Sequence, residues 1–233
     1  MNHQSPNRRR CRRQIFALAS LLLAALPAAY SCALPAVTAT PTLRVGPRHP
    51  LKAPSDAARI ARDGDTIEIE AGLYANDHAT WGQDNLTIRG VGGMAHLEWT
   101  ELVPNGKATW IITGDNVLVE NIEFSGARVK DTNGAGIRHE SGSLTLRNTF
   151  FHRNEFSILT GNDSSASITI EDSRFWHHRR PGRFSHGMYI GALKKFTLTG
   201  SHVMGTDRGH QIKSRALENH IRYNRIEDIP GGN

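Results

Sequence analysis

The fold follows from one repeated motif, whose first copy reads Val117-Leu118-Val119-Glu120-Asn121-Ile122-Glu123-Phe124. Three more copies and a looser fifth one come later in the chain. They span residues 144–151, 168–175, 196–203 and 221–226. The apolar residues that close the copies stand 23 to 28 positions apart. A constant motif with variable spacing is typical of a solenoid, in which stacked turns differ mainly in the length of their loops.

The inside of each copy predicts a strand with a sharp corner. Apolar and polar residues alternate, which is the pattern of a strand with one buried face. The alternation breaks at Asn121, Asn148, Asp172 and Gly200. These residue types tolerate the left-handed backbone that a sharp corner needs. We also expect stacked Asn side chains to hydrogen-bond from turn to turn, satisfying amide groups at the bend.

A second strand recurs once in every turn. Its copies lie at residues 136–139, 156–159, 187–190 and 209–212. Two or three short strands in a turn of about 22 to 28 residues predict a single-stranded parallel β-helix, an all-β fold. The alternative is a β-sandwich, but sandwiches have turn signals every 8–12 residues, whereas this motif returns only after a full turn.

The start of the domain agrees with this fold. Residues 54–62 have a Ser/Asp start signal and a short amphipathic pattern, which predicts a capping helix. The alternating segment Thr66–Glu70 follows as the first strand. From about Arg44 to Asn233 the chain resembles the pectate-lyase-like superfamily of right-handed parallel β-helices. That resemblance implies the handedness and the fold, and much less about activity.

The other end of the chain carries no capping signal. The sequence stops at Ile229-Pro230-Gly231-Gly232-Asn233, one turn after the fifth motif copy. Because solenoids need polar end caps for solubility, we expect a truncated domain of about six turns, whose longer relatives continue. An uncapped last turn also predicts edge-to-edge pairing or aggregation.

The first 33 residues read as an export signal. Five Arg residues between positions 8 and 13 precede an apolar run from Ile15 to Ala29, which is short for a membrane span. We therefore predict a signal peptide at 1–33, a linker at 34–43 and a β-helix domain at 44–233. The predicted location is secreted or periplasmic, with no stable transmembrane segment after the signal is removed. A twin-arginine signal and lipid attachment at Cys32 are the weaker alternatives.

Removing this leader changes the reading of charge. The chain has 28 Lys and Arg and 22 Asp and Glu, a net charge of +6. Without the five leader Arg residues the net charge is +1, so the high isoelectric point is no sign of nucleic-acid binding. Both cysteines, Cys11 and Cys32, lie in the leader, which leaves the mature domain without disulfides.

The second-strand column predicts a binding strip. By parity, Ile137, Met188, Ile190 and Ile212 point inward. The outward set is then Arg138, Glu140, Tyr189, Gln211, Lys213 and Arg215. The insertion at residues 176–186, which includes Arg179 and Arg180, is expected to overhang this face. Cations and flat rings together suit an acidic polysaccharide, so Arg138, Glu140, Gln211, Arg179 and Arg180 are the predicted substrate-binding residues. A merely solvated basic face remains the alternative.

One segment on this strip points to a reaction. Residues 212–219 resemble the Ile-x-Ser-Lys-Ser-x-Glu-Asn segment of the chondroitinase-B and alginate-lyase family. In that family the Lys is the base that removes the proton next to a uronate carboxylate, which calcium neutralises. Arg215 occupies the base position here, and Lys213 lies two residues earlier. The family's acidic calcium ligands correspond to His210 and Arg208, so the cofactor stays unknown and calcium is expected only through the resemblance.

β-Elimination on a uronate polymer is the predicted chemistry. Since Arg stays protonated and is a poor base, Lys213 or His186 is the predicted base. Arg215 or Arg138 would neutralise the carboxylate, and Tyr189 would protonate the leaving oxygen. We predict no metal site from the sequence. The alternatives are a non-catalytic carbohydrate-binding or surface β-helix, an inactive truncated remnant, and a hydrolase whose acid pair joins Glu140 with Glu218 or Asp207.

Overall fold

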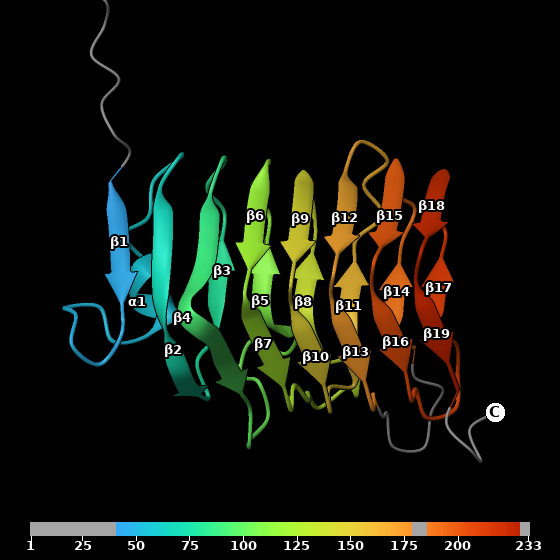
Figure 1. The fold of residues 1–233 in the computed structure, drawn as a ribbon, viewed down its shortest axis with the longest axis horizontal. Coiled ribbons are helices and arrows are strands. Elements are labelled where there is room, and N and C mark those ends of the chain that lie inside the picture. Colours follow the sequence, from blue (N-terminus) through green and yellow to red (C-terminus); the bar gives the residue numbers. More distant parts are fainter. Residues whose placement is uncertain (1–40, 179–185, 229–233) are drawn as a thin grey trace, which may run out of the picture. The chain divides into compact units, whose positions relative to one another are not determined.

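A computed structural model describes residues 41–178 and 186–228 of the chain, and it confirms the all-β parallel solenoid (Figure 1). The strands wind into a right-handed β-helix of about seven turns, where the sequence predicted six. In order, the elements are β1 (Thr42–Val45), α1 (Pro54–Ala58), β2 (Thr66–Ala75), β3 (Ala79–Trp81), β4 (Thr87–Glu98), β5 (Ala108–Ile112), β6 (Val117–Glu120), β7 (Ile122–Ser125), β8 (Ala135–His139), β9 (Ser143–Arg147), β10 (Phe150–His152), β11 (Phe156–Thr160), β12 (Ser167–Glu171), β13 (Arg174–Trp176), β14 (Met188–Ile190), β15 (Lys195–Thr199), β16 (His202–Met204), β17 (Ile212–Ser214), β18 (Glu218–Arg222) and β19 (Arg225–Glu227). No helix among the described residues has the length and apolar character needed to cross a bilayer.

The strands form two sheets, in which every pairing is parallel. The small sheet runs β17-β14-β11-β8-β5-β3. The large sheet contains β1 and β2 at its start and has two limbs that join at β4. The first limb continues through β6, β9, β12, β15 and β18, and the second through β7, β10, β13, β16 and β19. In Figure 1 these strands follow one another from turn to turn in the order of the chain.

In the second limb, the residues that close successive motif copies pair with one another in register. Phe124 pairs with Phe151, Phe151 with Phe175, Phe175 with Val203, and Val203 with Ile226. The first three rings stack in the core, with centroids 4.9 Å and 5.2 Å apart. The same column starts two turns earlier, at Tyr74 and Leu97, where the sequence motif is too diverged to be seen.

The predicted corners lie where the alternation breaks. Asn121, Asn148, Asp172 and Gly200 all have positive φ angles, between 46° and 65°. Asn148 donates a hydrogen bond of 2.7 Å from Nδ2 to the Oδ1 of Asn121, which confirms the expected contact between turns. At Gly200 a Cβ atom would lie 2.2 Å from an oxygen of the Asp172 side chain, so a larger residue at this corner would force that carboxylate to move.

The N-terminal cap is shorter than predicted. Helix α1 covers Pro54–Ala58 and buries Pro54 and Ala57, while Ile60 lies beyond the helix and is 53% exposed. The Asp56 carboxylate accepts hydrogen bonds from two backbone N–H groups just before the helix, which lowers the pKa of Asp56. The first strand begins at Thr42, two residues before the predicted domain boundary. Residues 1–40 lie outside the described part, and so does the predicted signal peptide.

The parity of the second strand is also confirmed. Ile137, Met188 and Ile190 are fully buried, and Ile212 is partly buried against the core. In the last described turn the apolar residues Ile221 and Ile226 are 43% and 46% exposed. The interior that is closed in the earlier turns is thus open to solvent at these two side chains.

Candidate functional site

The outward residues of the small sheet form one column, as predicted. The register of the strands places Ile111, Arg138, Leu159, Tyr189 and Lys213 side by side on consecutive turns. Neighbouring strands lie about 4.8 Å apart. Tyr189 and Lys213 are therefore direct neighbours, whereas Leu159 separates Tyr189 from Arg138.

Three of the predicted catalytic residues come together at the later end of this column. The Lys213 Nζ atom lies 5.0 Å from the centroid of the Tyr189 ring, a cation–π distance. The imidazole ring of His186 lies 5.8 Å from the same ring. A cation, a phenol and an imidazole thus come close together in space, although they are separated by up to 27 positions in the sequence.

His186 lies behind the exposed strip and not on it. Its side chain is largely buried, and its ring stacks on the ring of His210 at 5.0 Å. The Nδ1 atom of His186 accepts a hydrogen bond of 3.1 Å from the backbone N–H of His210. Since this lone pair is engaged, Nδ1 is not available as a base. His210 stands two residues before the inward Ile212, so strand alternation predicts an inward side chain. This prediction is wrong, because the His210 side chain is exposed.

Arg138 is neutralised by a neighbour that was predicted to bind substrate. Its Nε donates a hydrogen bond of 3.0 Å to Glu140 Oε1, and Lys107 Nζ lies 3.5 Å from the same oxygen. Both predicted residues do lie on the outer face. One carboxylate is shared by two cations, so the positive charge of Arg138 is partly offset at this point of the strip.

Gln211 is the one predicted strip residue among the described ones that is buried. Its amide is tied on both sides, with Thr206 Oγ1 donating to Oε1 at 2.8 Å and Nε2 donating to Asp228 Oδ1 at 2.7 Å. The expectation that Gln211 points outward is therefore wrong, because the loop before β17 turns it into the structure. Arg179 and Arg180 lie outside the described residues.

The segment that resembles the lyase family spans β17, the turn after it and the start of β18. Ser214 Oγ donates to Asn219 Oδ1 at 2.5 Å, and Asn219 Nδ2 donates to the Ala216 carbonyl at 2.9 Å. The matching Ser and Asn thus hold a turn, and Arg215 between them is exposed. Calcium takes oxygen ligands, so the two positions where the family has acidic ligands, Arg208 and His210, do not fit calcium.

The surface around the column is partly apolar. Ala108, Ala135 and Phe156 form a small cluster on which Ile111, Leu159 and Tyr189 pack. The strip therefore has an apolar surface between its charged groups.

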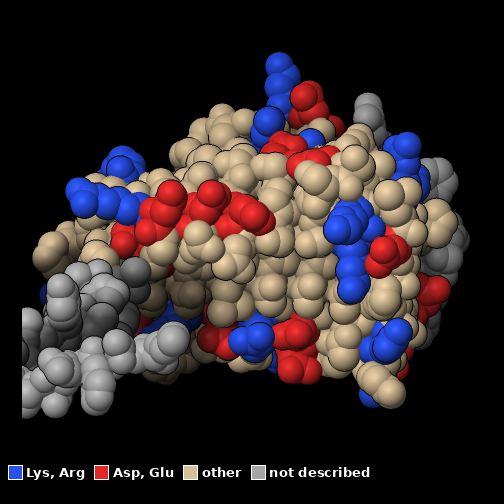
Figure 2. All heavy atoms as spheres, turned by 90° about the horizontal axis from the view of Figure 1, so that it is seen from above, with Lys and Arg blue, Asp and Glu red and all other residues tan. Residues whose placement is uncertain are grey.

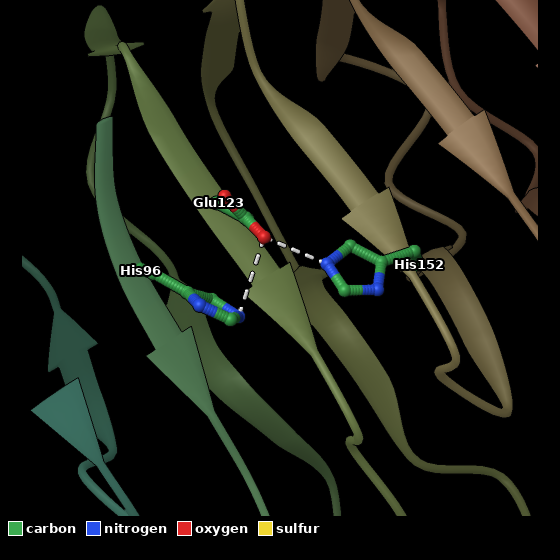
Figure 3. Close-up of side chains that lie close together, drawn as sticks. All are labelled: His96, Glu123 and His152. Carbon is green, nitrogen blue, oxygen red and sulfur yellow. Dashed lines mark hydrogen bonds and ion pairs between the residues drawn. The ribbon is translucent and has the colours of Figure 1, made fainter. Parts of the chain in front are cut away.

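A second cluster, which sequence reasoning missed, lies on the second limb of the large sheet. His96 on β4, Glu123 on β7 and His152 on β10 converge from three consecutive turns (Figure 3). Glu123 Oε1 lies 2.8 Å from His152 Nε2 and 3.4 Å from His96 Nε2. Burial lowers the pKa of His152, although the hydrogen bond with Glu123 acts in the opposite direction.

The signal for this cluster was incomplete in the sequence. Glu123 stands inside the first motif copy and His152 directly follows the second, but His96 belongs to a turn without a visible motif. His152 also pairs in register with Ser125 and not with Glu123. Its side chain reaches Glu123 diagonally, and a column argument does not predict such a contact.

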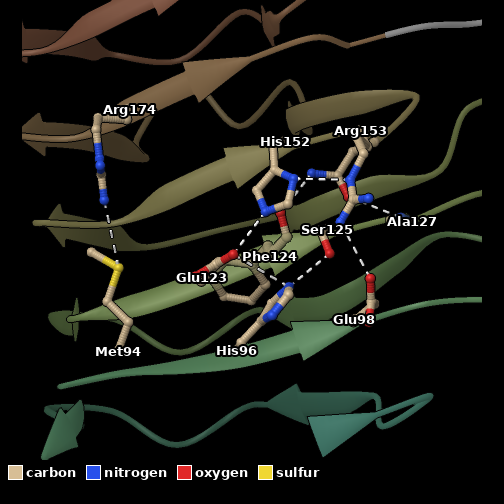
Figure 4. Close-up of polar contacts among 11 residues, drawn as sticks. Met94, His96, Glu98, Glu123, Phe124, Ser125, Ala127, His152, Arg153 and Arg174 are labelled. Carbon is tan, nitrogen blue, oxygen red and sulfur yellow. Dashed lines mark hydrogen bonds and ion pairs between the residues drawn. The ribbon is translucent and has the colours of Figure 1, made fainter. Parts of the chain in front are cut away.

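Aromatic and cationic side chains lie next to this cluster. The guanidinium carbon of Arg174 lies 4.5 Å from the centroid of the Phe150 ring, which packs edge-on against Trp176 at 5.0 Å. Figure 4 shows Arg174 directed toward Met94, while Arg153 lies between His152 and Glu98. The second limb thus has its own exposed surface of rings, imidazoles and charges.

The face of the molecule drawn in Figure 2 carries both basic and acidic side chains. Basic side chains are scattered over it, whereas several acidic side chains form a contiguous row toward the upper left. The described part has several such mixed pairs on the large sheet, including Arg89 with Glu68 at 2.7 Å and Arg147 with Glu171 at 3.0 Å. These pairs line up across neighbouring turns and keep the local charge balanced.

Comparison with known proteins agrees with the fold. The family described as "Right handed beta helix region" matches residues 71–232, more than half of the chain, and the chain belongs to this family. Among solved structures, the crystal structure of pectate lyase Pel9A is similar with a TM-score of 0.56 at 18% identity. The match covers 74% of this chain and 51% of the pectate lyase, so the chain spans about half the length of that protein.

Two structures of the pectin methylesterase from Aspergillus niger, in deglycosylated and penultimately deglycosylated form, are also similar. Their TM-scores are 0.39 at 13% and 12% identity, and each match covers 81% of this chain and 87% of the esterase. No curated protein matches the chain. The family match and the likeness to the pectate lyase support the architecture, and the chemistry has to be argued from the side chains.

Proposed function

We propose that the protein acts on an acidic, uronate-containing polysaccharide bound along the outer face of the small sheet, and cleaves it by β-elimination. The observation that carries this proposal is the placement of Lys213 next to Tyr189. A primary amine and a phenol on neighbouring strands supply the two proton-transfer groups that the reaction needs. The likeness to a pectate lyase supports the choice of substrate class.

The proposed step transfers two protons and breaks one bond. Lys213, in its neutral form, removes the proton from C5 of the uronate. The electron pair forms the C4–C5 double bond, and the C4–O bond to the leaving sugar breaks. Tyr189 gives its phenolic proton to the departing oxygen. Lys213 then loses its extra proton to the solvent and Tyr189 regains one, which returns both side chains to their starting states.

Arg215 is the proposed partner of the uronate carboxylate. Its side chain is exposed and belongs to the turn directly after β17, two residues beyond Lys213. Arg138 is less suited to this role because Glu140 holds it. His186 is proposed to position the Tyr189 ring, since its ring lies beside that of Tyr189 and its Nδ1 is engaged by the backbone.

The test is turnover on a panel of uronate polymers. Pectate, alginate and glycosaminoglycans are incubated with the protein, and the ultraviolet absorbance of the new C4–C5 double bond is followed. Lys213→Ala is expected to abolish the signal, while Lys195→Ala, a lysine on the large sheet, leaves it unchanged. If the native protein produces no unsaturated product on any polymer, β-elimination is excluded.

Non-catalytic binding of the same polymers is the second candidate. The cation–π contact between Lys213 and Tyr189, together with the apolar surface around it, favours this function. If the protein only binds, immobilised pectate or alginate retains it and no unsaturated product is released. Retention without turnover therefore selects binding over cleavage.

Export is part of the proposal. The Arg-rich leader and its apolar run support a secreted or periplasmic protein. N-terminal sequencing of protein recovered from the medium or the periplasm is expected to start shortly after residue 33. A mature N-terminus at Cys32 would instead indicate the lipoprotein alternative.

A further inference from the structure

The cluster of His96, Glu123 and His152 is the strongest feature that the proposed function does not use. It lies on the second limb of the large sheet, whereas the proposed substrate lies on the small sheet. The three side chains are 14% to 23% exposed, so they are partly shielded from water and still reachable. Their nearest nitrogen and oxygen atoms all lie within 4.8 Å of one another.

We propose that these three residues bind a divalent transition metal ion, with zinc as the best match. Two imidazole nitrogens and one carboxylate oxygen form the donor set that zinc takes in sites with three protein ligands. Nitrogen donors disfavour calcium and magnesium, which prefer oxygen. Within residues 41–178 and 186–228, no other group of three such ligands comes together.

Two of the three separations between the ligand atoms are close to those that zinc requires, and the third, between the two imidazoles, is at most 4.8 Å. Bonds of about 2.0–2.1 Å in tetrahedral geometry separate ligand atoms by roughly 3.4 Å. The separation of His96 Nε2 from Glu123 Oε1 is already 3.4 Å. His152 Nε2 lies 2.8 Å from the same oxygen, so it has to withdraw by about 0.5 Å, a small side-chain rotation.

The backbone holds the three ligands in place without metal. His96 and Glu123 pair directly in register, and the adjacent strand supplies His152. Parallel strands that are paired on both sides do not spread when an ion enters. The ion therefore meets ligands whose positions are largely fixed, and little ordering entropy opposes binding.

Two neighbours contact the imidazole rings, and one of them fixes the tautomer of His152. Ser125 Oγ lies 2.8 Å from His96 Nε2 and has to turn away when that nitrogen binds metal. Arg153 Nε donates a hydrogen bond of 3.1 Å to His152 Nδ1 (Figure 4), so without metal the proton of this ring sits on Nε2. Metal binding moves the proton to Nδ1, where it faces the N–H of Arg153.

This conflict makes Arg153 an antagonist of the metal. Its side chain is 61% exposed and already lies 3.3 Å from Glu98, so it has another partner when His152 changes tautomer. Replacing Arg153 by Ala removes both the opposing donor and a nearby positive charge. The Arg153→Ala variant is therefore expected to bind zinc more tightly than the native protein.

The test is a calorimetric titration of zinc into the chelator-treated full chain. The native protein is expected to take up one zinc ion, and Co²⁺ in place of zinc is expected to give the intense visible absorption of a tetrahedral site. His96→Gln, Glu123→Gln and His152→Gln are each expected to lose uptake at concentrations that saturate the native protein. Far-UV circular dichroism establishes that these variants are folded.

A matched control lies on the same face. His202 Nε2 is 3.2 Å from Glu227 Oε2, which is a His–Glu pair on β16 and β19 without a second imidazole as third ligand. His202→Gln is expected to leave zinc uptake unchanged. Absence of uptake by the native protein overturns the proposal, and so does uptake that survives Glu123→Gln. Weaker zinc binding by Arg153→Ala contradicts the assigned ligand atoms.

Discussion

Asn148 donates a hydrogen bond of 2.7 Å to Asn121, the residue at the same corner of the preceding turn. Both residues have left-handed backbone, with φ angles of 46° and 57°. The side chain thus has two functions at this corner. Asparagine tolerates the left-handed backbone better than most residues, and its amide links two turns of the solenoid.

Two substitutions of Asn148 separate these functions. Asn148→Gly keeps the corner and loses the hydrogen bond, at an expected cost of about 1 kcal/mol of unfolding free energy. Asn148→Ala also forces a Cβ atom into left-handed backbone and is expected to cost about 2 kcal/mol. Urea denaturation measures both values. Equal costs for the two variants contradict the role assigned to the backbone.

The neighbours Phe150 and Phe151 differ in what they stabilise. Phe151 is fully buried between Phe124 and Phe175, so Phe151→Ala is expected to cost about 3–5 kcal/mol. Phe150 lies on the outer face beneath Arg174, and Phe150→Ala is expected to cost about 1 kcal/mol. Thermal unfolding of the two variants compares them directly. A reversed order refutes the register of β10.

Stability is expected to fall in acid because of buried His178. Complete burial lowers the pKa of this imidazole to about 3 from an ordinary value of 6.5. Between these pH values the unfolded chain binds a proton that the folded chain does not. The contribution of His178 to the unfolding free energy is therefore fully present above pH 6.5. Below that pH it decreases by up to about 1.4 kcal/mol per pH unit.

His139 adds to this pH dependence, because burial lowers its pKa as well. Denaturation curves at a series of pH values measure the slope. His178→Gln is expected to flatten it, even if the variant is less stable at neutral pH. The control is His220→Gln, since this imidazole is 36% exposed. An unchanged slope in His178→Gln excludes His178 as the source.

The phenol of Tyr189 distinguishes cleavage from binding. Tyr189→Phe keeps the ring that faces Lys213 and removes the proposed proton donor. For a lyase, turnover of the uronate polymer is expected to fall by about 100-fold or more, with KM little changed. For a binder, affinity for the polymer stays at the native value. Steady-state kinetics and retention on immobilised polymer provide the two measurements.

Glu140 partly offsets the positive charge of the strip through its ion pairs with Arg138 and Lys107. Glu140→Gln releases Arg138 and Lys107, so affinity for an acidic polymer is expected to rise roughly 2- to 5-fold, with a steeper dependence on salt. Glu171→Gln is the control, because it breaks the Arg147 ion pair on the large sheet. Binding that improves equally in both variants places the polymer elsewhere.

Much of the architecture could be predicted from the sequence. The residues that close the motif copies form one column, which is buried from Phe124 to Val203 and becomes exposed at Ile226, and the residues that break the alternation are the corners. This succeeds because a parallel β-helix maps one residue of each turn onto the same residue of the next. Period-two alternation then fixes which side chains point inward.

The candidate sites were predictable only in part. Parity places Arg138, Tyr189 and Lys213 in one column, but it does not show that Glu140 holds Arg138 or that Gln211 is buried. Both depend on side-chain direction and on the path of a loop. Neither is contained in the repeat.

The sequence by itself determined the solenoid, its corners and its inward faces, because these follow from local alternation repeated at the length of a turn. Only the tertiary structure brought His96 beside Glu123 and His152. That contact joins a turn without a visible motif to two turns with one, and its last step is diagonal across the sheet. The order of residues along the chain fixes register, whereas packing decides where each side chain turns within it.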